Sequence, residues 1–324
     1  MNVTLKQLRA FVAVAHAQSF TGAAAQLHVT QSTLTASIQI LEGEIGMRLF
    51  DRSTRAVQLT AQGQQFLPAA QRLLRELQQA LDDMRQTADL QRGTVAVAAA
   101  ASFIDYVLSA AVADMAHSYP GIRVRLTEAT TDDACAMVLD GEVDFAVTTL
   151  VERPALLDAA LVLTDTYGSV QHAEHPLSAE TGPMRWSRLA PHVMVALPKA
   201  SGIRALVDQQ PQIADRLKQP AYEVASMSSL SPLLARGFGY AVLPALAAQP
   251  LVEDGLRFVP LREPVLRRSL FVFKKRGRAL TPAAQALLEK TCGALQALAT
   301  ARHVKLYLDE AAVRVFAQPG RPTA

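Results

Sequence analysis

Apolar residues recur at helical spacing in three successive segments of the first fifty residues, with polar residues between them. The apolar positions of the first segment share one face: Leu5, Leu8, Phe11, Val12 and Ala15. Residues 19–27 predict a second helix, and Thr30 is a good N-cap for a third. The third segment also has one apolar face: Leu34, Ile38, Leu41 and Ile45. Residues 49–52 and 57–59 then alternate like the strands of a short hairpin.

A long helical pattern runs from Thr60 to about residue 87. Its apolar residues are spaced alternately by four and three positions, as in a heptad seam: Phe66, Ala70, Leu73, Leu77, Ala80 and Met84. Such a stripe needs a partner surface, so we expect the helix to pair with a second copy of the chain. Packing on the chain's own core is the alternative.

From residue 93 onward, short β-branched strands alternate with helices. The expected strands are 94–99, 122–127 and 143–148, and the expected helices between them are 103–117 and 132–140. This βαβ order predicts a parallel sheet in an α/β fold. A second set of strands and helices over 193–243 predicts a second lobe, with crossings between the lobes at 161–164 and 256–261.

The pattern therefore predicts four regions. They are a winged helix-turn-helix at 1–60, a linker helix at 61–90, a two-lobed α/β domain at 91–300 and a tail at 301–324. Within the α/β domain we expect the first lobe at about 91–161 and 267–300, and the second at about 162–266.

Composition agrees with a multidomain globular protein. The chain has 324 residues, 50% apolar and 19% charged, which suggests about two domains and little global disorder. Only Cys135 and Cys292 are present, too few for a disulfide scaffold or a multi-cysteine metal centre. No signal-peptide core and no apolar run of roughly 18 residues is visible, so we expect a cytoplasmic protein without a membrane partner.

The net charge of +3 is a cancellation between segments. Residues 91–261 carry 12 basic and 18 acidic side chains, whereas residues 262–324 carry 12 and 4. Residues 1–60 carry 5 basic and 3 acidic side chains. This balance excludes a polybasic protein that binds nucleic acid over its whole surface, but it permits nucleic-acid binding by a limited basic region.

Residues 20–38 have the spacing of apolar and polar residues that is typical of a helix-turn-helix. Small Ala24 lets two helices cross closely, and the second of them turns polar, short side chains outward. Those within reach of base edges or phosphates are Thr30, Gln31, Ser32, Thr33, Thr35 and Gln39. The basic residues expected to hold the DNA backbone are Arg9, Arg48, Arg52 and Arg55.

These motifs resemble those of LysR-type transcriptional regulators over about residues 3–300. The matching stretches are LRAFVAVA (8–15), SFTGAA (19–24), LHVTQS (27–32), LE (41–42), GMRLFDR (46–52) and LTAQG (59–63). The resemblance implies a winged helix-turn-helix, a dimerising linker helix and an effector domain resembling periplasmic binding proteins. It also implies a homotetramer that binds promoter DNA and responds to a small molecule.

Hydroxyl residues at strand ends and helix starts indicate where an effector would bind. Two helix N-termini that face one cleft, at Ser102 and Ser201, would favour an anion such as a carboxylate. The expected effector-binding residues are Ser102, Phe103, Thr130, Thr149, Ser201 and Met227. The alternative for each Ser and Thr is a helix cap without a ligand.

Other functions have less support in the sequence. His172 and His175 resemble a metal-ligand run but fit a loop, and Cys135 and Cys292 are either a redox switch or buried bystanders. No catalytic constellation has recognisable spacing, so we expect neither an enzyme nor a cofactor or metal. A two-lobed solute-binding protein is the alternative function, although it would need an export signal and no winged N-terminus.

Overall fold

The computed structural model describes residues 2–53, 56–86, 93–150, 155–298 and 301–307. It divides into two compact units, residues 1–85 and 86–324. None of the helices in the described ranges is both long enough and apolar enough to cross a membrane.

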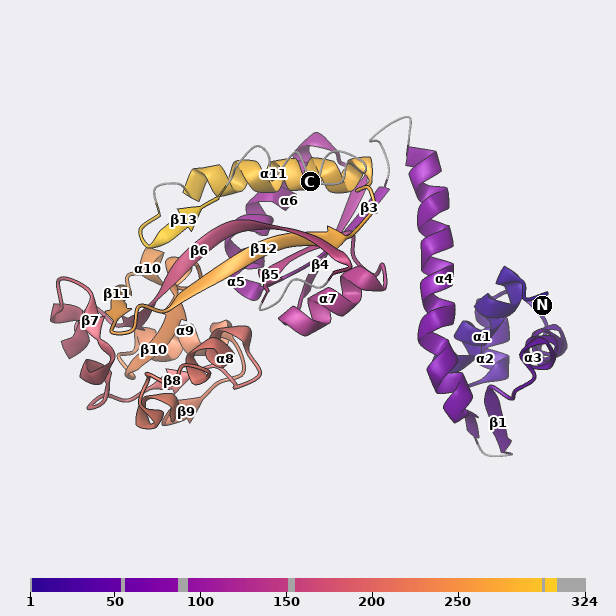
Figure 1. The fold of residues 1–324 in the computed structure, drawn as a ribbon, viewed down its shortest axis with the longest axis horizontal. Coiled ribbons are helices and arrows are strands. Elements are labelled where there is room, and N and C mark those ends of the chain that lie inside the picture. The colour runs from indigo at the N-terminus through magenta and orange to yellow at the C-terminus, as the bar shows by residue number, and fades with distance from the viewer. Residues whose placement is uncertain (1, 54–55, 87–92, 151–154, 299–300, 308–324) are drawn as a thin grey trace. The chain divides into compact units, whose positions relative to one another are not determined.

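The first unit contains three short helices, a hairpin and the linker helix (Figure 1). The elements are α1 (Leu5–Ala17), α2 (Phe20–Gln26), α3 (Gln31–Ile45), β1 (Phe50–Ser53), β2 (Ala56–Leu59) and α4 (Ala61–Gln86). The apolar faces predicted for α1 and α3 meet in one core, because Phe11, Leu34 and Ile38 are each at most 2% exposed. The winged helix-turn-helix is therefore confirmed.

The long helix α4 divides its apolar stripe between two environments. Ala70 is fully buried, and Phe66, Leu67 and Leu74 pack against the helix-turn-helix core. Leu73, by contrast, is 49% exposed and Leu81 is 39% exposed. Packing on the chain's own core, the alternative interpretation of the stripe, thus accounts for its first two positions, Phe66 and Ala70, whereas Leu73 is left exposed.

The second unit is built on a nine-stranded mixed sheet. Its main order is β4-β3-β5-β12-β6-β11-β7, and β10 and β13 also pair with β6. The first-lobe strands are β3 (Gly93–Ala99), β4 (Ile122–Glu128) and β5 (Phe145–Thr149), which are parallel as predicted. The antiparallel strands β6 (Leu157–Gln171) and β12 (Arg267–Lys275) run from this lobe into the next.

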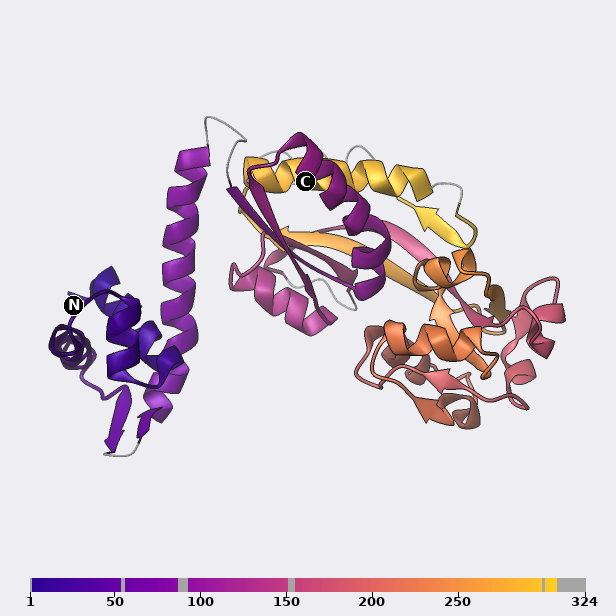
Figure 2. The same cartoon turned by 180° about the vertical axis from the view of Figure 1, so that it is seen from behind.

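Helices cover both faces of the first-lobe sheet. One continuous helical stretch comprises α5 (Ala101–Phe103), a π-helical turn (Ile104–Leu108) and α6 (Ser109–Ser118). α6 packs beside α11 (Pro282–Ala297) on one face, and α7 (Thr131–Leu139) covers the other (Figures 1 and 2). Alternate residues of β3 enter the two clusters: Val95 and Val97 on the α11 side, Ala96 and Ala98 on the α7 side.

The second lobe has shorter elements. They are β7 (Met184–Arg185), β8 (Val195–Ala196), α8 (Gly202–Asp208), β9 (Tyr222–Glu223), α9 (Met227–Ala235), β10 (Tyr240–Pro244), α10 (Ala245–Glu253) and β11 (Arg257–Arg262). Three 3₁₀ turns complete it: Pro176–Ala179, Trp186–Leu189 and Asp215–Lys218. Helix α10 lies at the junction, because Leu246 joins the first-lobe core while Leu251 joins a second-lobe core.

One expectation about the lobes is wrong. The crossing expected at 256–261 is β11, which pairs with β7 and with the far half of β6, so β12 makes the second crossing instead. In the described part of the tail, the strand β13 (Val304–Leu306) pairs with β6 at Leu163–Asp165. Residues 308–324 lie outside the described residues.

Candidate functional site

The turn between α2 and α3 is fixed by two caps and a close helix crossing. The hydroxyl of Ser19 accepts the Gly22 N–H at 3.2 Å, and that of Thr30 accepts the Thr33 N–H at 3.2 Å. Ala23 and Ala24 are buried where the helices meet, as their small side chains require. This geometry fixes the direction in which α3 leaves the core.

Most of the predicted DNA-contacting residues lie on the open side of α3. Exposed positions are Thr30, Gln31, Ser32, Thr33 and Gln39, and Thr35 is half-buried. Several hydroxyls already have protein partners, since Thr30 Oγ1 lies 2.9 Å from Ser32 Oγ and 2.8 Å from Thr33 Oγ1. Thr30 is therefore a cap as well as a candidate contact.

The basic residues are placed on elements beside α3. Arg9 is exposed on α1, and Arg48 is exposed in the loop before the wing. Arg52 lies in β1, but its side chain is outside the description, and Arg55 falls outside the described residues altogether.

Two side chains that the sequence did not single out for this purpose hold the loop of Arg48. Glu42 Oε1 accepts the N–H groups of Leu49 (2.8 Å) and Phe50 (3.2 Å), and so ties α3 to the wing. Thr60 Oγ1 donates to the Arg48 carbonyl at 2.8 Å while accepting the Gly63 N–H at 3.0 Å. The start of α4 is thereby tied to the backbone of a predicted phosphate contact.

In the second unit, Ser102 belongs to a buried ionic network. Arg268 Nη1 donates to Ser102 Oγ at 3.1 Å, and Arg268 Nε and Nη2 bind the two Asp165 oxygens at 3.0 and 2.8 Å. Asp165 also accepts the N–H of Leu246, in α10, at 3.0 Å. Burial alone would lower the pKa of Arg268, but the Asp165 carboxylate outweighs it and raises that pKa. The network joins α5, both crossing strands and α10.

The other predicted effector residues are placed more simply. Thr130 and Ser201 are the N-caps of α7 and α8, accepting the N–H groups of Asp133 and Arg204. The Thr149 hydroxyl lies 2.6 Å from that of Thr131, and Met227 begins α9 half-buried. Phe103 is fully buried in the first-lobe core.

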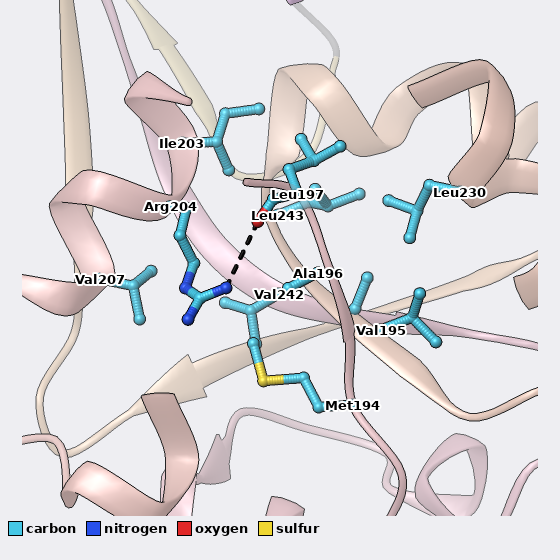
Figure 3. A pocket seen from close by; sticks show the side chains of 11 residues that line it. Met194, Val195, Ala196, Leu197, Ile203, Arg204, Val207, Leu230, Val242 and Leu243 are labelled. Atoms are coloured by element: carbon cyan, nitrogen blue, oxygen red, sulfur yellow. Dashed lines mark hydrogen bonds between the residues drawn. The ribbon is translucent and has the colours of Figure 1, made fainter. Parts of the chain in front are cut away.

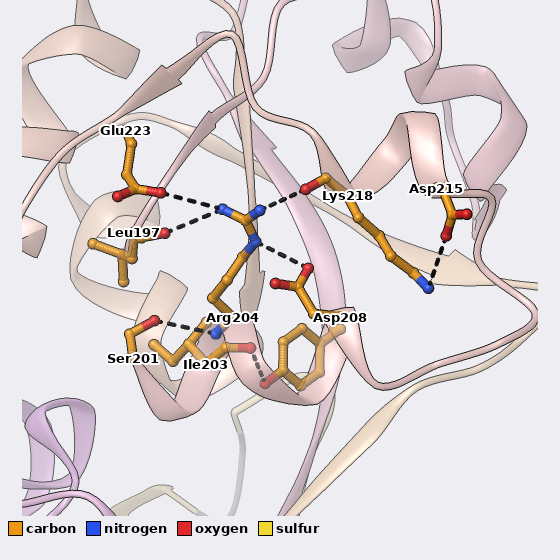
Figure 4. A network of polar contacts seen from close by, with 9 residues as sticks. Leu197, Ser201, Ile203, Arg204, Asp208, Asp215, Lys218 and Glu223 are labelled. Atoms are coloured by element: carbon orange, nitrogen blue, oxygen red, sulfur yellow. Dashed lines mark hydrogen bonds and ion pairs between the residues drawn. The ribbon is translucent and has the colours of Figure 1, made fainter. Parts of the chain in front are cut away.

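Beside Ser201, a second buried arginine organises the second lobe (Figure 4). Arg204, only 3% exposed, binds Asp208 Oδ1 at 3.1 Å and donates to the carbonyls of Leu197 and Lys218. An adjoining hollow of about 10 Å³, lined mainly by apolar side chains, has room for roughly one water molecule (Figure 3). At this volume it is too small to hold an effector molecule.

Several basic residues of the segment 267–278 have partners inside the protein. Arg268 and Lys274 are 2% and 5% exposed, and Lys274 and Arg276 both bind Asp158. The burial of Arg268 and Lys274 could have been predicted from the sequence. Together with Leu270 and Val272 they occupy every second position of the strand, so all four side chains lie on the same face of it and point inward. Parity could therefore have identified Arg268 as a buried residue that needs an acidic partner.

Neither cysteine has the environment of an activated thiol. Burial raises the pKa of Cys135, helped by Asp132, and burial raises that of Cys292, helped by Glu289. A raised pKa leaves little thiolate at neutral pH. Within the described ranges, no group of three or more His, Cys, Asp or Glu residues could hold a metal ion.

Comparison with family models covers most of the chain. The model of bacterial regulatory helix-turn-helix proteins of the lysR family matches residues 5–64, and the LysR substrate binding domain matches residues 88–291. The uncharacterized HTH-type transcriptional regulator YbhD of Escherichia coli (strain K12) is 31% identical over 287 residues, 88% of this chain and 90% of YbhD. A probable hydrogen peroxide-inducible genes activator of Mycobacterium avium is 33% identical over 55% of this chain and 57% of its own.

Solved structures share the fold. A full-length OxyR variant from Pseudomonas aeruginosa aligns with a TM-score of 0.67 at 22% identity, covering 95% of this chain and all of that one. CbnR complexed with its target DNA aligns with a TM-score of 0.64 at 21% identity, covering 90% and 99% of the two chains. At these identities the likeness concerns the fold.

Proposed function

Because the chain belongs to the LysR family of bacterial helix-turn-helix transcriptional regulators, we propose that it binds promoter DNA and adjusts transcription in response to a small molecule. The observation that carries the DNA-binding role is the polar, exposed side of α3, together with exposed Arg48 in the loop that follows this helix. A helix of this kind enters a major groove while neighbouring cations bind phosphates. Since this activity requires contact with the chromosome, we expect the protein to act in the cytoplasm.

We assign the effector to the second unit. The proposed effector-binding residues are Ser102, Phe103, Thr130, Thr149, Ser201 and Met227. The uncapped start of α5 supports this assignment, because its N-cap residue, Ala100, has no side chain that can satisfy the first N–H groups. Such groups favour an anionic ligand. We propose regulation rather than catalysis as the activity of this unit.

We further propose a homodimer formed through α4, assembling into a homotetramer. The exposed Leu73 and Leu81 support the dimer, since large apolar side chains on a surface helix gain stability when a partner covers them. CbnR, a protein of the same fold, was solved with its target DNA.

A gel-shift titration tests DNA binding directly. Full-length protein should bind its own upstream DNA at nanomolar concentrations and a shuffled sequence of equal length at least a hundredfold more weakly. Replacing exposed Arg48 by Ala should weaken binding to both fragments and lower the salt dependence by about one released counterion. Equal affinity of the unchanged protein for both fragments would contradict sequence-specific regulation.

A further inference from the structure

The side of α3 that is open to solvent carries no cation. Between Gln31 and Ile45 there is no Lys, Arg or His, and the charged residues are Glu42 and Glu44. Both carboxylates accept hydrogen bonds from backbone N–H groups. Glu42 accepts from Leu49 and Phe50, and Glu44 Oε2 accepts from Asn2 at 2.8 Å. Base contacts from α3 must therefore come from uncharged groups.

The side chains at the centre of this open side are also short. At 3.6 residues per turn, the direction opposite buried Leu34 and Ile38 falls on Ser32, Ala36 and Gly43, which are exposed. A Cβ added at Gly43 would meet nothing within 4 Å. Small side chains allow the helix backbone to approach the floor of a groove closely, so a methyl group on a base edge could contact Ala36 directly.

The hydrogen-bonding groups of the same side are unequally available. The Ser32 and Thr33 hydroxyls lie beside Thr30, and Gln31 Oε1 accepts from the Thr21 hydroxyl at 3.2 Å. The side chain of Gln39 is exposed and makes no hydrogen bond within the described part of the chain, so its amide offers a donor and an acceptor together.

These properties select among base pairs. Guanine is read mainly by Arg or Lys on its O6 and N7, adenine by the paired donor and acceptor of Gln or Asn, and the thymine methyl by small apolar side chains. We propose that α3 is specific for A·T pairs, with Ala36 contacting a thymine methyl and Gln39 pairing with an adenine. This inference rests on the proposed DNA-binding function and names the base composition that this function reads.

Selection from a randomised double-stranded library with the full-length protein tests the proposal. The enriched half-sites should carry A·T pairs at the central contacted positions. Substituting deoxyuridine for the contacted thymine removes one methyl group and should weaken binding about fourfold. The A36G variant should lose this sensitivity to the methyl group, whereas the Q39A variant should keep it and lose its preference for adenine.

A gain of function provides the matched comparison. A36R places a guanidinium at the centre of the open side and should create a guanine preference at one position of each half-site. A25R adds the same charge at an exposed position of α2 and should raise affinity for all sequences without altering base preference. A G·C core selected by the unchanged protein, or identical base preferences for A36R and A25R, would overturn the proposal. Selection of no sequence at all would instead refute the DNA-binding function on which it rests.

Discussion

Arg268 Nη1 donates a hydrogen bond to Ser102 Oγ at 3.1 Å, although the two residues are 166 positions apart. Both are buried, and Arg268 is also held bidentately by Asp165. Because the Ser102 oxygen accepts from Arg268, its own O–H proton is directed elsewhere, where it can serve as a donor. Ser102, which was selected from the sequence because it lies at a helix start, is thus oriented by Asp165 and Arg268 on the two strands that join the lobes, β6 and β12.

The first prediction concerns this ion pair. Replacing Arg268 by Met should destabilise the second unit by about 3–5 kcal/mol, because it leaves the Asp165 carboxylate buried without a counter-charge. The double variant D165N/R268M should recover much of the loss, since Asn retains an acceptor for the Leu246 N–H. Urea unfolding followed by fluorescence of Trp186, the single tryptophan and 3% exposed, measures both. Equal destabilisation of the two variants would contradict a charge-pair origin.

The second prediction concerns the junction of wing and linker helix. A Cβ at Gly63 would lie 2.2 Å from the Leu49 carbonyl oxygen, closer than atoms can approach. Gly63→Ala should therefore displace the start of α4 and cost about 1–3 kcal/mol. Differential scanning calorimetry should show a lower melting temperature for the first unit. Gly43→Ala, where nothing lies within 4 Å, is the control and should be neutral or slightly stabilising.

The third prediction concerns the leucines left exposed on α4. Leu73 and Leu81 are exposed in the single chain and would be covered in the proposed dimer, so replacing both by Lys should place two charges in the interface and weaken the dimer at least tenfold. Sedimentation velocity over a concentration series measures the change. Lysine at exposed Gln62 and Gln65 of the same helix adds equal charge and should leave the dimer intact. A dimer that survives the leucine changes would place the interface elsewhere.

The fourth prediction concerns acid stability of the second lobe. The His175 and His192 rings are 4.9 Å apart, and burial together with His192 lowers the pKa of His175. Below the ordinary histidine pKa of about 6.5 the unfolded chain takes up a proton that the folded chain resists, so stability falls as pH drops. This part of the stability is present above that pH and is lost progressively toward the lower folded pKa.

A matched variant isolates this effect. His175 Nδ1 accepts the Leu177 N–H at 3.2 Å, a role that an Asn side chain also fills. His175→Asn should therefore keep the turn and reduce the fall in melting temperature between pH 7.5 and 5.5. His303, whose pKa burial also lowers, should leave a residual dependence. An unchanged fall in the variant would remove His175 as a cause.

The local elements of this protein were predictable because they depend on neighbours in the chain. The caps at Ser19, Thr30 and Thr60 were readable from a hydroxyl residue followed by a helical apolar pattern. The first-lobe strands were readable from β-branched runs. Of strand β6, only the crossing at 161–164 was predicted, because its fifteen residues cross two lobes and mix buried polar groups such as Asp165 and Ser169 with apolar ones.

The sequence by itself determined the winged helix-turn-helix, its polar outward helix and the alternation of strands and helices, since each follows from short-range periodicity. The tertiary structure decided which polar side chains are exposed and available to a ligand, and which form hydrogen bonds or ion pairs inside the protein. Arg268 lies in a segment rich in basic residues, yet it neutralises Asp165, and the first two positions of the heptad stripe, Phe66 and Ala70, pack on the chain's own core. Those outcomes depend on contacts between distant segments, and a charge or an apolar face acquires its role only when folding supplies the partner.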